Sequence, residues 1–338
     1  MKIIENKCLK SLNTFGIECT AKNFCQVDSY TDFLNLLGYP PKLDVPHLIL
    51  GGGSNVLFTK NLDLLVVKVN TRGIDVLKDG LNHVLVRTQA GEPWDDFVGF
   101  CVENGWGGLE NLSLIPGQVG SSPIQNIGAY GVELKDCLHQ VEAIEKKTGR
   151  YTIFTNSDCN FGYRDSFFKR EGKGLFIITA VTFILTKQNH NISVSYGGLK
   201  KELEEMGIFE PTISDVRKAV IKIRNSKLPD PEKTGNAGSF FKNPVVSPGE
   251  FSFLKNNYPD LVAFEVEGQV KLAAGWLIDK AGWKGYREGN AGVHSRQALV
   301  LVNHGNATGK EILALAKKIQ NSVFEKFGVD LEPEVNVI

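Results

Sequence analysis

The sequence predicts a protein of two or three domains with mixed helices and strands, and it argues against a doubly wound nucleotide-binding unit. The 338 residues give room for that many domains. Some stretches of apolar residues alternate or run together as in strands, whereas others recur at helical spacing. The glycine-rich turn after a strand expected at 47–50 leads into another strand at 62–69, where a dinucleotide-binding unit requires a helix.

The composition is ordinary for a soluble globular protein, with 42% hydrophobic and 22% charged residues. Lysine plus arginine (38) balances aspartate plus glutamate (38), so no overall field favours nucleic acid or anionic lipid. The six cysteines show neither C-x-x-C nor zinc spacing, which indicates reduced, mostly buried thiols and no metal cluster. We expect a cytoplasmic protein, because the N-terminus lacks an apolar signal region and no apolar run is long enough to span a membrane.

Helix and strand signals are interspersed through the first part of the chain. Ser29, with Asp32 three residues later, is expected to cap a helix that ends at 37. A second helix is expected at 93–104, with Pro93 at its start. Its inward face is expected to consist of Trp94, Phe97, Phe100 and Cys101. The expected strands are 47–50, 62–69, 83–89, a hairpin of 138–146 and 151–154, and a central strand at 175–185.

The pattern changes near Pro211, and we expect a domain boundary at about 210–214. An amphipathic helix follows at 214–224, with an inward face of Val216, Ala219, Val220 and Ile223. Further elements are a helix at 270–280, a strand at 297–302 and a last helix that Thr308 caps and Gly328 ends. The inward face of the last helix is expected to consist of Ile312, Leu315, Ala316, Ile319, Val323 and Phe327.

An uncharged stretch from 113 to 131 is the feature most indicative of function. Glycines at 117, 120, 128 and 131 and prolines at 116 and 123 interrupt any helical or strand period. Glycine lets a backbone approach a ligand closely and aim several amide groups at one point. The stretch therefore suits a large nucleotide whose phosphates are held by dipoles rather than by lysines. Ser121, Ser122, Gln125 and Asn126 add neutral polar groups. A long surface loop is the alternative.

Four further features each allow two interpretations. Gly-Gly-Gly-Ser-Asn at 51–55 is either a second phosphate-binding loop or a tight turn between strands. Arg164 is either part of a surface ion pair or an anchored, buried cation. Ser239 is either a nucleophile or a turn residue. The nucleophile is disfavoured, because no G-x-S-x-G elbow or triad histidine accompanies this serine. Glu334 is either a solvated acid near a frayed end or a residue held on a proline-stiffened, apolar tail.

Eight motifs, taken in order, closely resemble the UDP-N-acetylenolpyruvoylglucosamine reductases of peptidoglycan synthesis. Each motif alone is weak evidence, but their common order along the chain is specific. The turn at 195–199, which holds Tyr196, resembles the subgroup that closes a tyrosine loop over the substrate. The motifs are Asn-Thr-Phe-Gly at 13–16, Gly-Ser-Asn at 53–55, the block 109–131, Phe-Gly-Tyr-Arg-Asp-Ser at 161–166, Lys-Leu-Pro-Asp-Pro at 227–231, Gly-Asn-Ala-Gly-Ser-Phe-Phe-Lys-Asn-Pro at 235–244, the block 271–279, and Leu-Glu-Pro-Glu-Val at 331–335.

The resemblance implies an α+β protein with the vanillyl-alcohol-oxidase-like FAD-binding fold and a third, substrate-binding domain. The domains it implies are a first FAD-binding subdomain at 1–70, a second at 71–210 and a substrate-binding domain at 211–327. The C-terminal segment 328–338 is expected to return to the active site. FAD and NADPH are the implied cofactors, and a UDP-sugar is the implied substrate. We expect a monomer that binds neither nucleic acid nor membrane.

The resemblance also assigns roles to individual residues. It implies that the catalytic residues are Arg164, Ser239 and Glu334. The substrate-binding residues it implies are Tyr163, Tyr196, Arg224, Lys227, Asn243 and Gln297. The cofactor-binding residues it implies are Gly51, Gly53, Ser54, Asn55, Val56, Ile115, Gly117, Gly120, Ser121, Ser122, Gln125, Asn126, Gly128 and Gly131.

The implied reaction is chemically consistent with these residue types. Hydride from the reduced flavin adds to the enolpyruvyl ether and leaves negative charge on the adjacent carbon and carboxylate. A guanidinium at Arg164 can stabilise that charge, and a protonated Glu334 can donate a hydrogen bond to it. Ser239 supplies the proton, and Lys227 or a water polarises its hydroxyl. Lys227 and Arg224 can meet the diphosphate of the substrate.

Two other functions remain as alternatives to this reductase. One is another FAD-dependent oxidase or dehydrogenase of the same fold, which would produce peroxide with an alcohol or hydroxy acid. The other is a nucleotide-binding module without catalysis, which would be colourless when purified.

Overall fold

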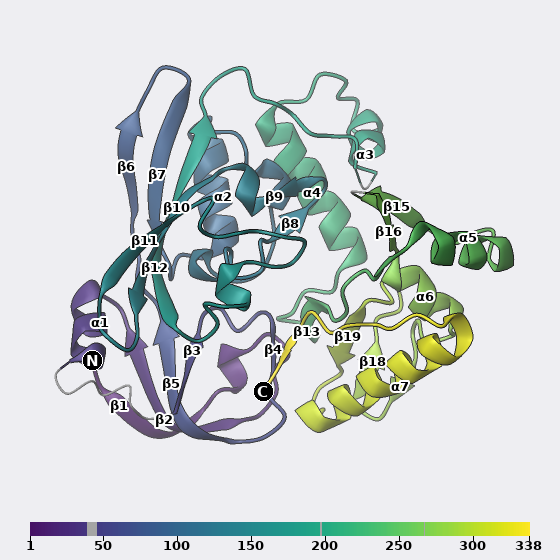
Figure 1. Cartoon of the computed structure of the whole chain (residues 1–338), viewed down its shortest axis with the longest axis horizontal. Helices are drawn as coiled ribbons and strands as arrows, with labels where there is room; N and C mark the ends of the chain where they lie inside the picture. Colours follow the sequence, from purple (N-terminus) through teal and green to yellow (C-terminus); the bar gives the residue numbers. More distant parts are fainter. Residues whose placement is uncertain (39–45, 197, 267) are drawn as a thin grey trace. The chain divides into compact units, whose positions relative to one another are not determined.

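The computed structural model describes residues 1–38, 46–196, 198–266 and 268–338 (Figure 1). The chain forms two compact units, each assembled from separate stretches of sequence. The first unit comprises Met1–Lys7, Ala21–Gly52 and Leu62–Ser226. The second comprises Cys8–Thr20, Gly53–Asn61 and Lys227–Ile338.

A sheet with three parallel strands begins the first unit. Its order is β1 (Ile3–Cys8), β2 (Thr20–Val27), β5 (Leu62–Val69) and β3 (His47–Leu50), and β5 runs parallel to both β2 and β3. The predicted helix between β2 and β3 is α1 (Tyr30–Leu37), and Ser29 and Asp32 form its capping box. The carboxyl ends of β3 and β5 are adjacent because Leu50 pairs with Lys68. Gly51 follows directly at this edge.

The second sheet of this unit is antiparallel and surrounds the predicted central strand, β12 (Phe176–Thr186). Its order is β11 (Tyr151–Thr155), β10 (Leu138–Glu145), β12, β7 (His83–Gln89) and β6 (Ile74–Asp79). Helix α2 (Trp94–Glu103) packs on it through Phe97, whose ring centroid lies 4.9 Å from that of Phe183. The expected inward face is wrong at Phe100, which is 36% exposed; its ring packs on Trp106 instead.

Short elements and two helices complete the first unit. The stretch 113–131 contains no long helix or strand, as its punctuation predicts. The short elements are η3 (Glu110–Leu112), η4 (Val119–Ser121), β8 (Gly128–Ala129), β9 (Val132–Glu133), η5 (Leu134–Asp136) and η6 (Phe167–Lys169). Helices α3 (Leu199–Glu205) and α4 (Ile213–Lys227) follow. All four residues of the predicted inward face of α4 are buried.

The described residues of the second unit form two small sheets, one pair of parallel strands and three α-helices. One sheet has the order β13 (Gly235–Ser239), β19 (Val300–Asn303), β18 (Ala291–Val293) and β17 (Arg287–Glu288). The other has the order β14 (Val245–Val246), β16 (Gln269–Leu272) and β15 (Ala263–Val266). The helices are α5 (Pro248–Asn257), α6 (Ala274–Lys280) and α7 (Gly309–Phe327). Near the chain end, β20 (Asn336–Val337) pairs in parallel with β4 (Val56–Leu57). A short 3-10 turn, η1 (Lys10–Leu12), also belongs to this unit.

Several boundaries in the second unit differ from the sequence prediction. The helix expected at 270–280 starts only at Ala274, because Val270 and Leu272 belong to β16 and pair with β15. The strand expected at 297–302 starts at Val300, after a turn closed by a hydrogen bond from Val300 N to Gln297 O. The boundary between the compact units falls at Ser226–Lys227, so α4 packs with the first unit. Thr308 and Gly328 cap α7 as predicted, and its predicted inward residues are buried.

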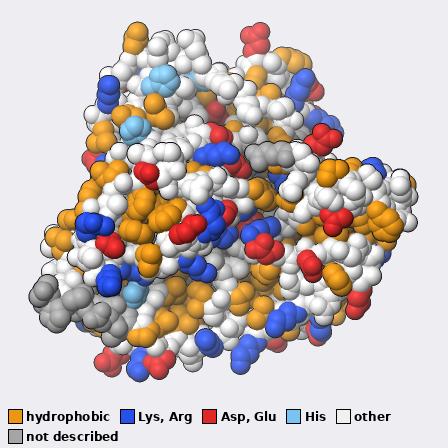
Figure 2. Space-filling view, viewed as in Figure 1, with side chains coloured by type: hydrophobic (Ala, Val, Ile, Leu, Met, Phe, Trp, Pro, Cys, Tyr) orange, Lys and Arg blue, Asp and Glu red, His pale blue; other side chains and the backbone are white. Residues whose placement is uncertain are grey.

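The distribution of surface charge and the state of the cysteines agree with what the composition indicates. Figure 2 shows acidic and basic side chains interspersed on the visible face. All six cysteines are free thiols, and five of them are buried. None of the helices in the described ranges combines the length and apolarity that crossing a membrane requires.

Candidate functional site

The two glycine-rich segments of the first unit touch each other. A Cβ atom on Gly52 would lie 2.8 Å from the Cα of Gly117, so only glycine permits this approach. A Cβ on Gly51 would lie 3.4 Å from Gln118 Oε1. The turn after β3 and the loop 113–122 therefore form one wall, as expected of two loops that hold the same nucleotide.

Residues 120–122 of this loop make contacts that stabilise the loop itself. A Cβ on Gly120 would lie 2.5 Å from the Cβ of Ala90, and Gly120 N donates to Ala90 O. The hydroxyls of Ser121 and Ser122 donate to Gln118 O and Val119 O, each over 2.7 Å. The hydroxyl hydrogens of these two serines thus stabilise the turn η4. Ser122 is fully buried, whereas Ser121 is half-buried and its oxygen retains acceptor capacity.

Protein groups hold the end of the stretch in place. Asn126 is fully buried; it donates to Glu133 Oε2 and Gly162 O and accepts from Lys135 N. Its side chain therefore braces this part of the loop against Glu133, Gly162 and Lys135. A Cβ on Gly131 would lie 3.2 Å from the Cβ of Tyr196, so this glycine makes room for the tyrosine turn. Ile115 packs on the core, and Gln125 is half-buried.

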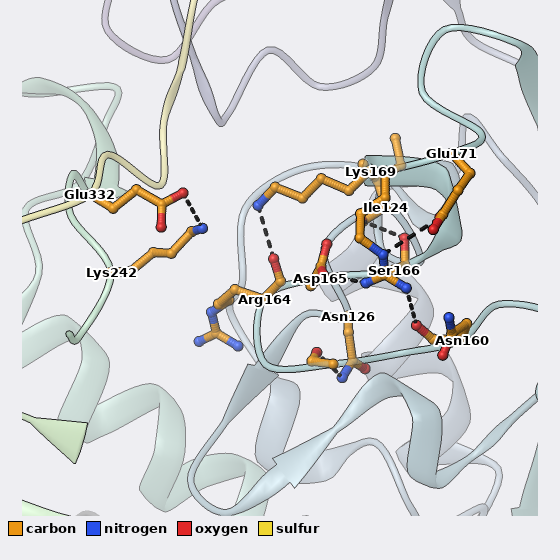
Figure 3. A network of polar contacts seen from close by, with 12 residues as sticks. Ile124, Asn126, Asn160, Arg164, Asp165, Ser166, Lys169, Glu171, Lys242 and Glu332 are labelled. Carbon is orange, nitrogen blue, oxygen red and sulfur yellow. Dashed lines mark hydrogen bonds and ion pairs between the residues drawn. The ribbon is translucent and has the colours of Figure 1, made fainter. Parts of the chain in front are cut away.

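Arg164 is anchored, as one of the two predicted alternatives requires, but its side chain is half-buried rather than buried. Its Nη2 donates to the carbonyl of Gly128 over 2.7 Å. Its own carbonyl accepts from Lys169 Nζ over 2.9 Å (Figure 3). Its guanidinium lies 5.5 Å from the ring centroid of Tyr163. The backbone at Arg164 is left-handed, with φ of 53°, a conformation that costs a non-glycine residue free energy.

The loop around Arg164 is tied to the glycine-rich stretch. Ser166 Oγ donates to Ile124 O over 2.7 Å, and Arg170 forms an ion pair with Asp165 and donates to Asn160 O (Figure 3). Together with the Arg164–Gly128 bond, these contacts fix the direction of the Arg164 side chain. The sequence indicates the motif but not this bracing.

Arg224 lies on the last turn of α4, and its Nε atom is buried with no hydrogen-bond partner among the described residues. Burial lowers the pKa of its guanidinium, the nearby Arg164 lowers it further, and Tyr130 and Asp95 oppose the shift. A guanidinium whose Nε is buried without a partner is costly in the absence of an anion. The predicted role of Arg224 in binding an anionic substrate is thus chemically reasonable.

A partly buried ion pair positions the helix that carries Arg224. Arg217 on α4 binds Asp95 on α2 through two bonds of 2.6 and 3.1 Å. Asp95 Oδ1 also accepts from Leu114 N over 2.5 Å, where the glycine-rich stretch begins. Leu114 has a left-handed backbone with φ of 59°. One carboxylate therefore fixes α2, α4 and the loop.

In the second unit, Ser239 and Glu334 belong to neighbouring segments. Ser239 ends β13, opposite Val300, directly after Gly238 with φ of 69°. Glu334 N donates to the carbonyl of Phe240 over 2.8 Å. The residue after Ser239 therefore holds the backbone of Glu334. Both side chains are half-buried, so Glu334 is not on a frayed, solvated end.

The tail that carries Glu334 is fixed on both sides. An isolated bridge joins Phe241 to Pro333, and β20 pairs with β4. Asn55 Nδ2 donates to Glu334 O over 3.2 Å. The second glycine motif thus supports the tail, and its Gly53 is required because a Cβ there would lie 2.0 Å from Leu12 O. Ser54 and Val56, which flank Asn55, are half-buried.

The remaining predicted substrate residues lie in different settings. Lys227 is exposed, at the end of α4. Asn243 Oδ1 accepts from Ala274 N at the start of α6 over 2.9 Å. Gln297 Oε1 accepts from Leu299 N over 3.4 Å and lies 3.2 Å from where a Cβ on Gly275 would be. Tyr196 is 37% exposed, and Gly197, in the same turn, lies outside the described residues.

Four residues of the first unit have notable settings that the sequence did not predict. Tyr130 has a left-handed backbone with φ of 49°, burial raises the pKa of its phenol, and Arg224 counteracts this shift. Asp95 lies in the predicted helix 93–104 and Lys68 in the predicted strand 62–69, and neither belongs to a recognisable motif. Gln118 was passed over among the glycines, although its position inside the uncharged stretch was a usable signal.

The first unit fits a bound dinucleotide. Gly52 and Gly117 make the close approach that such loops require. Gln118 Oε1 and Arg224 Nε are buried polar atoms with no partner among the described residues. Ligand groups would satisfy an acceptor and a donor of this kind. Within the described ranges, no cluster of three or more histidine, cysteine, aspartate or glutamate residues offers a metal site.

Comparisons with known proteins identify similar chains. Residues 230–338 match the C-terminal domain of UDP-N-acetylenolpyruvoylglucosamine reductase, and residues 21–154 match an FAD-binding domain. The reductase of that name from Flavobacterium johnsoniae is 52% identical over 339 residues, covering 100% of both chains. The one from Chromobacterium violaceum is 51% identical over 328 residues, covering 96% of each. The crystal structure of the Thermus caldophilus reductase has a TM-score of 0.71 at 24% identity, covering 100% of this chain and 99% of that one.

Proposed function

Because the chain belongs to the UDP-N-acetylenolpyruvoylglucosamine reductase family, we propose that Arg164, Ser239 and Glu334 carry out its chemistry. The protein is an FAD-containing, NADPH-dependent reductase that converts the enolpyruvyl ether of a UDP-sugar to UDP-N-acetylmuramate for peptidoglycan synthesis. Its α+β fold is the predicted FAD-binding fold with an additional domain. The FAD supplies two-electron transfer from NADPH to the enolpyruvyl double bond.

Each of the three residues has one proposed task. Arg164, fixed by Gly128 and Lys169, stabilises the negative charge that develops on the carboxylate. Ser239 donates the proton to the carbon, since a carbanion or enolate is basic enough to take it. Glu334, in its protonated form, donates a hydrogen bond to the carboxylate. The observation that carries this proposal is the 2.8 Å bond from Glu334 N to Phe240 O, next to Ser239.

The remaining residue roles are proposed from the resemblance to the family, and residue chemistry supports the polarising and diphosphate-binding roles among them. Lys227 or a water polarises the Ser239 hydroxyl, and Lys227 and Arg224 bind the diphosphate. Tyr163, Tyr196, Asn243 and Gln297 contact the rest of the substrate. The two glycine-rich motifs and the residues named with them hold the FAD. Three of these residues act indirectly: Asn126 and Ser122 through the shape of the loop, and Gly128 by accepting the hydrogen bond from Arg164. The domain division at 70 and 210 is part of the same proposal.

We also propose that the enzyme works as a monomer in the cytoplasm. Its nucleotide substrates are charged, and NADPH is a cytoplasmic reductant. The six free thiols fit a reducing compartment. Size-exclusion chromatography with light scattering tests the oligomeric state.

The decisive experiment follows the flavin colour through the two half-reactions. The purified protein should be yellow, should bleach with NADPH without oxygen, and should recover its colour with the enolpyruvyl UDP-sugar. Ser239→Ala should still bleach but should recover its colour on the order of 10²–10⁴-fold more slowly. Ser252→Ala, which removes an exposed hydroxyl on α5, is the matched control. Normal recovery in Ser239→Ala would assign the proton to another group.

The two alternative functions predict different outcomes in this experiment. A colourless protein would indicate a module without a flavin. Peroxide produced with an alcohol or hydroxy acid, without NADPH oxidation by the enolpyruvyl UDP-sugar, would indicate an oxidase of the same fold.

A further inference from the structure

Lys68 lies at the carboxyl end of a parallel strand, the edge of a sheet at which ligands bind. It is next to the last residue of β5, and its partner in the parallel strand β3 is Leu50. Its ammonium donates to the carbonyl of Gly51, the first residue of the glycine-rich turn. Ligands of open sheets bind outside the carboxyl ends of parallel strands. The Lys68 side chain therefore reaches the turn for which a phosphate-binding loop is one of the two predicted interpretations.

The surroundings of Lys68 lack an acidic partner. Its register partners in β2 and β3 are the uncharged Gln26 and Leu50. The charged group that acts on it is Arg72, which itself pairs with Glu92 over 3.4 Å. No carboxylate of a described residue lies within ion-pair distance of Lys68. A partly buried ammonium with only a carbonyl partner has an unmet need for an anion.

A second polar atom at the same turn also lacks a partner. Gln118 is 7% exposed, and its Nε2 donates to Gly91 O over 2.8 Å. Its Oε1 is buried without a hydrogen-bond donor among the described residues. This oxygen lies 3.4 Å from where a Cβ on Gly51 would be. The turn thus brings together a cation without an anion and an acceptor without a donor.

We propose that Lys68 and Gln118 form a subsite for the diphosphate of the dinucleotide cofactor and the hydroxyl groups that adjoin it. Lys68 donates to a diphosphate oxygen, and Gln118 Oε1 accepts from a neighbouring hydroxyl. This inference rests on the proposed function because it takes FAD as the ligand. It modifies the expectation that backbone dipoles alone hold the phosphates, since one lysine contributes a full charge.

The protonation of Lys68 gives this subsite a measurable signature. Burial lowers the pKa of the ammonium to about 8, and the charge of Arg72 contributes to the shift. A bound diphosphate favours the charged amine and raises that pKa again. Above pH 8 the amine of the empty protein is largely neutral, so FAD binding should take up a proton from solution.

The experiment is titration calorimetry of FAD into flavin-free protein, repeated in buffers of different ionisation enthalpy between pH 7 and 9.5. The wild-type protein should take up a fraction of a proton per FAD, rising with pH through 8. Lys68→Met should lose this uptake and bind FAD on the order of ten- to a hundredfold more weakly. Lys68→Arg should bind tightly without uptake, because arginine stays charged. Gln118→Leu should keep the uptake and weaken binding.

Controls separate this inference from the loss of a fold or of the function. Lys78→Met removes an exposed lysine of β6 and should match the wild type. Riboflavin, which lacks the diphosphate, should bind without uptake. Wild-type protein that binds FAD without uptake, together with full affinity in Lys68→Met, would overturn the inference alone. Wild-type protein that binds no FAD would overturn the proposed function as well.

Discussion

At the scale of single residues, Arg164 shows how the chain keeps a side chain in one orientation. Its left-handed backbone is unfavourable for a non-glycine residue by about 1–3 kcal/mol. Lys169 holds its carbonyl and Gly128 holds its guanidinium. An arginine in a simple surface ion pair would need neither of these two hydrogen bonds. The strain is consistent with a cation whose direction matters for stabilising charge.

Gly128→Ala should reduce turnover without reducing FAD affinity. A Cβ there would lie 3.0 Å from Arg164 Nη1 and 3.1 Å from Val132 O, so the guanidinium must shift. A displaced charge-stabilising group costs about tenfold or more in rate. Steady-state kinetics and an FAD titration measure the two effects. A weakened affinity with an unchanged kcat would instead assign Gly128 to the cofactor.

Glu334→Gln should slow the recovery of flavin colour by the substrate by about 10²-fold and leave reduction by NADPH unchanged. The carboxylic acid hydrogen bond is lost, whereas the backbone bond to Phe240 O remains. Glu332→Gln is the matched control, because this acid is exposed and pairs with Lys242 over 2.6 Å (Figure 3). Stopped-flow absorbance resolves both half-reactions, and equal rates in the two variants would remove Glu334 from the mechanism.

At the scale of elements, the Asp95–Arg217 pair links two helices that the sequence presents separately. The Asp95 side chain is 29% exposed and the Arg217 side chain is 18% exposed, so solvent screens the attraction between them only in part. A Cβ on Gly99 of α2 would lie 3.1 Å from Arg217 Nη2, which shows how closely α4 crosses α2. Periodicity predicts each helix, but it carries no information on which helices are paired.

A double-mutant cycle of Asp95→Asn and Arg217→Gln should show coupling of about 1–2 kcal/mol in the free energy of unfolding. The bidentate geometry supports a value above that of an exposed pair. Asp95→Asn should also raise the KM for the substrate, since α4 carries Arg224. Denaturant unfolding and steady-state kinetics provide the two readouts. Additive effects on stability would mean that the pair does not fix the helices.

The antiparallel sheet contains the Arg87–Glu142 ion pair, which should make the free energy of unfolding depend on pH in the acidic range. Burial of the Glu142 carboxyl works to raise its pKa, but the hydrogen bonds and charge of Arg87 outweigh it and lower the pKa below 4.5. A lowered carboxyl pKa contributes stability that is present above the unfolded value and is lost as pH falls through the folded value. Unfolding free energy should therefore fall below about pH 4.5.

Glu142→Gln isolates this contribution to stability. It should lower the unfolding free energy by about 3 kcal/mol at pH 7, because the Arg87 charge loses its buried partner. The variant should also show a flatter dependence on pH below 4.5. Urea titrations across pH measure both effects, and parallel pH curves for the two proteins would contradict the assignment.

Local sequence signals predicted most of the elements, and the failures have physical causes. Ser29 and Thr308 predicted their caps because a capping box depends on residues within one turn. Ser247 and Glu250 form the same box at α5, which was missed because the apolar residues after it lack a clear helical period. The helix expected at 270–280 failed because its first residues complete a ladder with β15, and strand pairing overrides local preference.

At the scale of the whole chain, the second unit is built from three segments that lie far apart in sequence. Glycines mark where these segments touch. A Cβ on Gly235 would lie 2.2 Å from Phe15 O, and one on Gly309 would lie 1.8 Å from Phe58 O. The sequence shows these glycines but not their neighbours. That is why motifs could assign Ser239 and Glu334 roles, whereas Lys68 and Asp95, which lie outside any motif, required the structure.

Deleting residues 336–338 tests whether the tail seats Glu334. Asn336 N and Nδ2 donate to Asn55 O over 3.1 and 3.0 Å, and Thr59 N donates to Ile338 O over 2.7 Å. Without these bonds, Glu334 keeps its bond to Phe240 O but loses the paired strand beyond it. We expect on the order of tenfold slower recovery of flavin colour with substrate, since a misplaced group loses rate steeply.

Asn336→Ala is the matched comparison for this deletion, because it keeps the backbone pairing and loses only the side-chain bond to Asn55 O. We expect this variant to stay within about twofold of the wild type, since an exposed side-chain bond contributes little. Stopped-flow absorbance with NADPH-reduced protein measures both variants. A deletion variant as fast as the wild type would mean that the contacts with Phe240 O, Asn55 Nδ2 and the bridge between Phe241 and Pro333 hold Glu334 in place without the paired strand.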